Sequence, residues 1–158
     1  MKVLTHYIRD IFYGANDGIV TTFAIVTGAI GASLGHNVIL ILGFANLLAD
    51  GFSMAASNYL GIRSEYDVNH ADGNVSSNYV YKHAAATFVS FVVAGSLPLL
   101  PFVLGRGGFI VAALATSVTL FVIGGVLGKF VLHRKWYSWG FQMLFVGGVA
   151  SGTAFLIG

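Results

Sequence analysis

Residues 38–62 read VILILGFANLLADGFSMAASNYLGI and contain a single charged side chain, Asp50. A helix needs about 20 apolar residues to cross a hydrocarbon layer about 30 Å thick, so this stretch is long enough to span a membrane. Similar stretches lie at 11–34, 83–104, 109–128 and 137–157. We therefore predict an all-α polytopic membrane protein with five transmembrane helices, in a single domain over 1–158, with a cytosolic loop at 63–82.

The composition supports a membrane protein and excludes several other classes. Of the 158 residues, 56% are hydrophobic and 9% are charged, against about a quarter charged in a typical soluble domain. So few charges cannot cover a water-facing surface, and lipid must supply most of the contacts. The eight basic residues are scattered at segment ends, which is not the pattern of a nucleic-acid groove. Cysteine is absent, so any metal ligand must be carboxylate, imidazole, thioether or amide.

The basic residues predict the orientation of the chain, because Lys and Arg near span ends are retained on the cytoplasmic side. With the N-terminus in the cytoplasm and the C-terminus outside, only Arg106 faces outward. We expect the cell membrane in a prokaryote and a vacuolar-type membrane in a eukaryote. The residues that then face the cytoplasm are Lys2, Arg9, Arg63, Lys82, Lys129, Arg134 and Lys135.

Glycine and proline predict how the spans pack and bend. Several glycines are spaced four apart, which lets helix backbones approach closely, although this spacing also arises by chance in glycine-rich membrane sequences. Pro98 and Pro101 either kink the third span or end it. The spaced pairs are Gly14/Gly18, Gly31/Gly35, Gly124/Gly128 and Gly148/Gly152.

Two carboxylates lie inside predicted spans, where each costs about 2.5 to 3.5 kcal/mol on insertion scales and therefore marks a pathway or a paired site. Asp17 is about 12 Å along its helix from the inner boundary, and Met54 is about 13 Å from the same boundary, so the two share a depth. In the second span, Asn46, Asp50, Met54 and Asn58 recur every four residues and so lie along one helix face. In the first span, Asp17 and Thr21 make a matching pair, with Asn16 beside them.

These groups favour a transition metal as cargo, with Asp17, Asp50 and Met54 as ligands and the other polar residues along the path. Mg²⁺ and Ca²⁺ take oxygen ligands, whereas a thioether adds softness that suits iron(II), and manganese(II) remains acceptable. A carboxylate that binds a proton when the metal leaves would allow antiport. We expect no permanently bound cofactor, since the Fe²⁺ or Mn²⁺ is transported.

Other interpretations of the same residues stay open. Asp17 and Asp50 could join helices through hydrogen bonds, Met54 could fill the core, and Asn46 and Asn58 could bond between helices. The histidines at membrane interfaces and in loops, His83 among them, are interpreted as solvated polar residues. Acidic and imidazole side chains in the predicted loop could attract cations or simply keep the loop soluble. These loop residues are Glu65, Asp67, His70 and Asp72.

The run 14–20, GANDGIV, together with the run 53–56, SMAA, then Tyr59 and Arg63-Ser64, resembles the signature of the vacuolar iron transporter family. The run 97–101, LPLLP, and Gly147-Gly148 are similar too, and the likeness covers essentially the whole chain. The resemblance implies five spans, a homodimer, and export of iron(II), sometimes manganese(II), from the cytosol in exchange for protons. It carries the metal path onto Asp17 and Met54.

Two departures from the family pattern matter. Many members carry a large carboxylate-rich helical domain between the second and third spans, where this chain has only residues 63–82. A Glu commonly follows the Ser-Met-Ala-Ala run, where this chain has Asn58, and Asp50 stands where a small residue is usual. The strongest rival function is a membrane scaffold or partner-binding subunit that transports nothing. An enzyme is disfavoured because no nucleophile triad or phosphate loop is evident.

Overall fold

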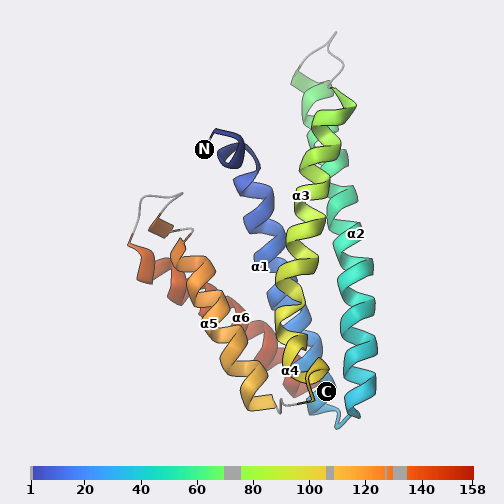
Figure 1. Cartoon of the computed structure of the whole chain (residues 1–158), viewed down its shortest axis with the longest axis vertical. Coiled ribbons are helices and arrows are strands. Elements are labelled where there is room, and N and C mark those ends of the chain that lie inside the picture. Colours follow the sequence, from blue (N-terminus) through green and yellow to red (C-terminus); the bar gives the residue numbers. More distant parts are fainter. Residues whose placement is uncertain (1, 70–75, 106–108, 127, 130–134) are drawn as a thin grey trace.

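The computed structural model describes residues 2–69, 76–105, 109–126, 128–129 and 135–158, and these are almost entirely helical (Figure 1). No strand occurs among them. The predicted all-α class is therefore confirmed. The elements are α1 (Lys2–Gly31), α2 (His36–Asn69), α3 (Ser77–Gly95), the 3-10 helix η1 (Leu97–Leu99), α4 (Leu100–Val103), α5 (Phe109–Val126) and α6 (Trp136–Ile157).

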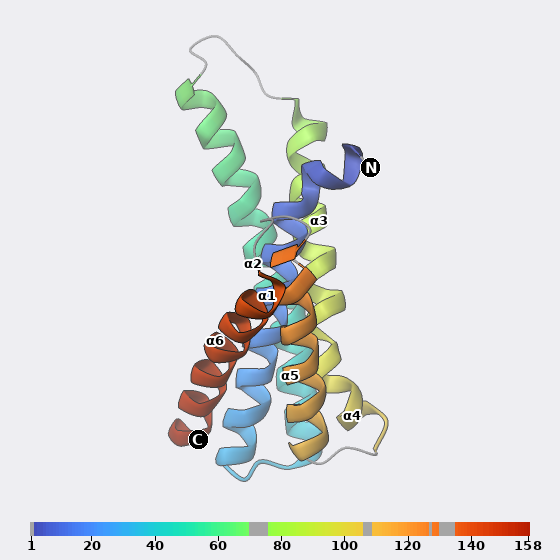
Figure 2. The same cartoon turned by 90° about the vertical axis from the view of Figure 1, so that its left-hand side faces the viewer.

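Among the residues that the structure describes, four segments are long and apolar enough to cross a membrane, namely His36–Val68, Ser77–Val103, Phe109–Val126 and Trp136–Ile157. Their outward faces are apolar, as shown by Leu156 and Phe145, which are 85% and 73% exposed. The chain is therefore an integral membrane protein, because such surfaces are stable against lipid. Together with α1, which is not among these four segments, they make an odd number of long helices, and the N- and C-termini accordingly lie at opposite ends of the bundle (Figure 2). Which end faces the cytosol stays a prediction.

Helix α1 carries polar side chains along much of its length, and it lies at the centre of the bundle. It packs against α3 and α6 most extensively and also against α2 and α5. Ile19, Thr22 and Val26 on α1 are completely buried. Because neighbouring helices rather than lipid surround it, α1 can hold polar groups that would be costly on a lipid-facing helix.

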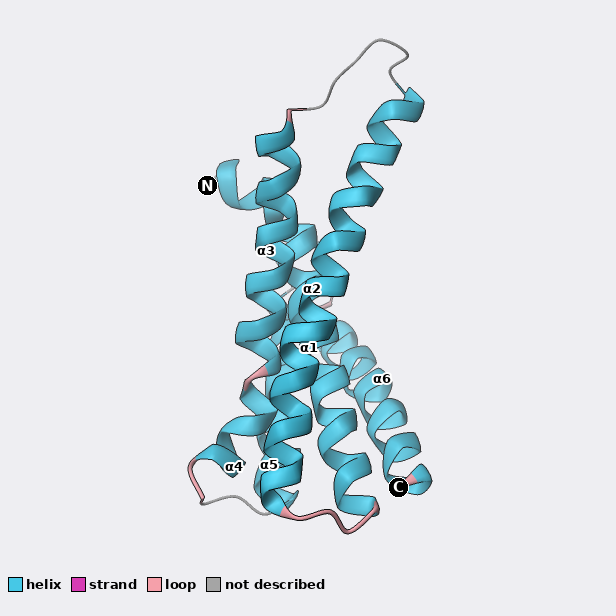
Figure 3. Cartoon of the chain, turned by 90° about the vertical axis from the view of Figure 1, so that its right-hand side faces the viewer, coloured by secondary structure: helices cyan, strands magenta, loops and turns pink. Residues whose placement is uncertain are grey.

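The predicted loop at 63–82 is mostly helical, which corrects the sequence-based expectation. Helix α2 continues to Asn69 and α3 begins at Ser77. The 34 residues of α2 extend about 51 Å at 1.5 Å per residue, which exceeds the hydrocarbon thickness of about 30 Å. Both helices project beyond the rest of the bundle (Figure 3). The loss of hydropathy after Ile62 marks a membrane boundary and not the end of the helix. Residues 63–69 contain no glycine or proline that would end it, so the helix continues beyond the membrane.

Glycines bring α1 and α3 into backbone contact. A Cβ atom added to Gly18 would lie 2.4 Å from the carbonyl oxygen of Phe91, and one added to Gly14 would lie 2.4 Å from that of Thr87. Gly124 likewise lets α5 approach the backbone of α6, whereas a Cβ atom added to Gly128 would meet the side chain of Trp139. Three glycines of the other predicted pairs have open space around them, so spacing alone did not identify packing contacts. These are Gly35, Gly148 and Gly152.

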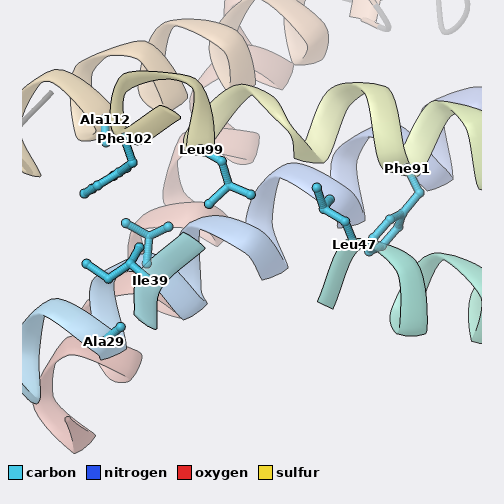
Figure 4. Close-up of a cluster of buried hydrophobic side chains, with 8 residues drawn as sticks. Ala29, Ile39, Leu47, Phe91, Leu99, Phe102 and Ala112 are labelled. Atoms are coloured by element: carbon cyan, nitrogen blue, oxygen red, sulfur yellow. The ribbon is translucent and has the colours of Figure 1, made fainter. Parts of the chain in front are cut away.

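The apolar core joins α1, α2 and α3 to the kinked region after α3. Leu47 of α2 faces Phe91 of α3, and Leu99 and Phe102 follow the kink (Figure 4). The helix is interrupted at Ser96, next to the buried Pro98. The kink predicted from the prolines is therefore present, and it turns η1 and α4 into the core.

Candidate functional site

The polar stripe predicted on α2 lies on an unbroken helix. Asn46, Asp50, Met54 and Asn58 are all half-buried, as expected for side chains on one helix face at the edge of a helix contact. Ser57 beside them is exposed. The four predicted residues therefore form a continuous polar line along α2.

The matching residues of α1, Asn16, Asp17 and Thr21, are also half-buried. The structure brings Asp17 near enough to Asp50 for the two charges to interact. Within the described residues, neither carboxylate has an ion-pair partner, and no hydrogen bond to either side chain occurs. The Thr21 hydroxyl donates to the backbone oxygen of Asp17 at 2.8 Å, so it bonds within its own helix.

Two amide side chains next to the carboxylates have buried atoms without partners in the described part of the chain. These atoms are Oδ1 of Asn16 and Nδ2 of Asn46. Buried polar atoms are normally hydrogen-bonded, and an exception points to a bound water, an ion or a functional role. Both amides were predicted path residues. The α1–α2 contact thus combines two unpaired carboxylates with polar atoms that a hydrated cation could satisfy.

A cavity of about 370 Å³ lies between α1, α2 and α3, on the N-terminal side of this carboxylate pair. Met54, Ser57 and Asn58 of α2 line it, together with Arg9, Asp10 and Tyr13 of α1 and Thr87 of α3. Asp17 and Asp50 are not among the lining residues. Asp10 precedes Asp17 by seven residues, which is about 10 Å along the helix. The cavity therefore reaches to within about two helical turns of Asp17 and has Met54 on its wall.

A buried polar network at this cavity was not predicted. Asp10 is 3% exposed, and its Oδ2 is hydrogen-bonded to Nδ1 of His83, which is 5% exposed. Asn58 donates to Oδ1 of Asp10 at 3.0 Å and to the Thr87 hydroxyl at 2.6 Å. The prediction that His83 is a solvated residue is wrong. Asn58 serves as the interhelical hydrogen-bond donor that the sequence had left as an alternative.

The sequence did contain an indication that Asp10 belongs with the predicted path residues. Asp10, Gly14, Asp17 and Thr21 follow the spacing of one helix face. His83 had no such signal. It lies 73 residues from Asp10 in the chain, and its burial depends on how α3 sits against α1.

The described residues do not contain a group of three or more His, Cys, Asp and Glu side chains that could hold a metal ion. The available donors are instead two carboxylates, a thioether and amides spread along two helices.

The acidic residues predicted to attract cations are only partly described. Glu65 and Asp67 are exposed on the projecting end of α2. They are two positions apart, so they point to different sides of the helix. His70 and Asp72 lie outside the described residues.

The chain matches a known protein family from residue 8 to residue 158. The model of the VIT family matches residues 8–81 and 72–158. "Vacuolar iron transporter" of Toxoplasma gondii is 42% identical over 66 residues, which cover 42% of this chain and only 22% of that protein. "Vacuolar iron transporter homolog 3" of Arabidopsis thaliana is 31% identical over 138 residues, covering 78% of this chain and 69% of the relative. Homolog 1 of the same plant is 32% identical with the same coverage.

Proposed function

Because the chain belongs to the VIT family, we propose that it carries iron(II), and also manganese(II), out of the cytosol in exchange for protons. The names of the relatives give transport as their activity and iron as their cargo. Transport of a metal ion across a membrane is therefore the function that the family supports, rather than catalysis. The choice of ion, the direction and the proton exchange are the further parts of the proposal.

The observation that carries the proposal is the pair Asp17 and Asp50. Two carboxylates in a membrane bundle repel each other, and no basic group of the described chain pairs with them. A divalent cation between them would neutralise both charges. A structural role as helix glue predicts hydrogen bonds to these carboxylates, and none is found in the described residues.

Asp17, Asp50 and Met54 would then bind the ion one after another as it moves. The amides of Asn16 and Asn46 would replace water molecules of its hydration shell. The mixture of oxygen donors and one thioether favours iron(II) over Mg²⁺ or Ca²⁺. The cavity lined by Met54 would admit the ion from the end that carries the N-terminus. We place the cytosol at this end, where the exposed Glu65 and Asp67 would raise the local concentration of cations.

The partial exposure of the proposed metal ligands supports a homodimer. Asp17, Asp50 and Met54 each remain partly exposed in the single chain, although exposed carboxylates are costly against lipid. The neighbouring side chains Phe52 and Tyr13 are both 70% exposed. A second copy packed on the same face would cover these groups and enclose the path.

Metal uptake into proteoliposomes tests the proposal. Purified protein is reconstituted, and uptake of iron(II), manganese(II), zinc(II) and cobalt(II) is compared side by side with an acidic or a neutral lumen. We expect iron(II) and manganese(II) to enter, faster with the acidic lumen. Equal uptake in protein-free vesicles would overturn the transport proposal and favour a scaffold. Uptake that ignores the pH gradient would indicate a passive channel.

A further inference from the structure

The buried pair Asp10 and His83 is not used by the metal path described above. The two side chains are hydrogen-bonded to each other across the α1–α3 contact, and both are almost fully buried. Ionisable groups in membrane bundles are costly, and uncharged side chains could join the helices at lower cost. The pair therefore calls for a functional explanation.

The surroundings hold both groups in place. Asn58 of α2 donates to Oδ1 of Asp10 at 3.0 Å, so both carboxylate oxygens are engaged. Thr87 donates to the backbone oxygen of His83 at 3.1 Å. The rings of Tyr7 and Tyr79 lie 4.6 and 4.5 Å from the imidazole ring. The imidazole is thus fixed with Nδ1 toward the carboxylate.

The pair also has access to protons and to the metal path. Asp10, Asn58 and Thr87 line the 370 Å³ cavity that Met54 also lines. Among the described residues, the titratable or charged groups near the pair are Arg9 and Tyr13 from α1, which line the cavity, and Tyr7 from α1 and Tyr79 from α3, whose rings pack on the imidazole. Helix α2 contributes the uncharged Ser57 and Asn58. The nearest formal charge among them is the exposed Arg9, whose Nε lies 4.0 Å from Oδ1 of Asp10.

We propose that Asp10 and His83 form the proton-binding site of the exchange, a proposal that rests on the proposed antiport. Histidine is the side chain that changes charge between about pH 5 and 8, and an adjacent carboxylate stabilises its protonated form. With a neutral imidazole the pair carries one negative charge, and with an imidazolium it carries none. For exchange, the proton reaches the pair from the far side, along the metal path past Asp17, and leaves to the cytosol through the cavity.

This charge change couples the proton to the metal. Asp10 lies about 10 Å along α1 from Asp17, so a proton on the pair makes the cavity less favourable for a divalent cation. Arrival of the metal expels the proton to the cytosol, and departure of the metal on the far side allows a new proton to bind. Each protomer would exchange one proton at this pair.

The test measures protons moved per metal ion. Proteoliposomes with an acidic lumen contain a pH-sensitive dye, and iron(II) uptake and lumen alkalinisation are recorded together for wild type, His83→Gln and Asp10→Asn. His36→Gln is the matched control, because His36 is exposed at the opposite end of α2. We expect both pair variants to lower the protons moved per iron(II) at least several-fold and to remove the effect of the gradient, while His36→Gln behaves as wild type.

Other results of this experiment would contradict either the proton site or the proposed function. If His83→Gln moved as many protons per iron(II) as wild type, the proton site would be overturned. Iron(II) uptake by the wild-type protein without any proton movement would overturn the proposed antiport. No metal uptake by wild type would instead overturn the proposed function. If neither pair variant is monodisperse in detergent, infrared difference spectra of wild type on iron(II) addition decide the matter. If the imidazolium bands decrease when iron(II) is added, the proposal is supported. If these bands do not change, it is refuted.

Discussion

Replacing Gly18 by alanine tests the close contact between α1 and α3 that positions the polar groups. The added Cβ atom would lie 2.4 Å from the carbonyl oxygen of Phe91 and 3.1 Å from its Cα atom. Ordinary contacts of a Cβ atom are about 3.4 Å or longer, so the two backbones must separate by about 1 Å. Neither backbone can rotate away as a flexible side chain would.

The magnitude follows from two opposing terms. Overpacking of a well-packed interior costs about 1 to 3 kcal/mol, whereas glycine to alanine within a helix gains about 1 kcal/mol. Gly61→Ala on α2 is the matched control, because a Cβ atom there meets nothing within 4 Å. The helix gain is common to both variants, so the difference between them is the overpacking cost alone. At about 2 to 4 °C per kcal/mol, the midpoints should differ by about 2 to 12 °C.

The assay is thermal unfolding in detergent, followed by the fluorescence of Trp136 and Trp139 on α6. Gly18→Ala should unfold below Gly61→Ala by the stated interval, and Gly61→Ala should unfold at or above wild type. Equal midpoints for the two variants would refute the backbone contact between α1 and α3.

Three further changes have defined outcomes. Asn58→Ala removes the donor that joins α2 to Asp10 and Thr87 and should cost about 1 to 3 kcal/mol, seen as a lower midpoint than Ser57→Ala in the same thermal assay. Thr27→Val removes a bond from α1 to the Ser151 carbonyl of α6 and should cost about 0.6 kcal/mol, seen as a midpoint about 1 to 2 °C lower in the same assay. Met54→Leu keeps an apolar side chain but removes the thioether, so the half-saturating iron(II) concentration for uptake should rise several-fold, with less effect on manganese(II). An equal effect on both ions would argue against a sulfur ligand.

Much of the fold follows from the sequence because lipid imposes a simple rule. Apolar runs of about 20 residues must be helices, so the spans at 109–128 and 137–157 agree with α5 and α6 to within two residues. The break at Pro98 follows from proline chemistry. The ends of α2 and α3 could not be found in this way, because hydropathy records where the membrane stops and a helix can continue into water.

The candidate site was predictable only where its residues share a helix. The four-residue spacing of Asn46, Asp50 and Met54 places them on one face, and the structure keeps them there. Contacts between helices depend on rotation and depth, which no local pattern encodes. The bond between Asp10 and His83 is of this kind, since it requires that glycines let α3 settle onto α1.

The proposed metal path is tested most directly by iron(II) uptake into vesicles that contain wild type or Asp17→Asn. The variant keeps the size of the side chain and removes its charge, and Thr153→Val on the exposed face of α6 serves as the control. The path through Asp17 predicts an initial rate at least about ten-fold lower for Asp17→Asn, equivalent to about 1.4 kcal/mol, and an unchanged rate for the control. Uptake by Asp17→Asn at the wild-type rate would contradict the path.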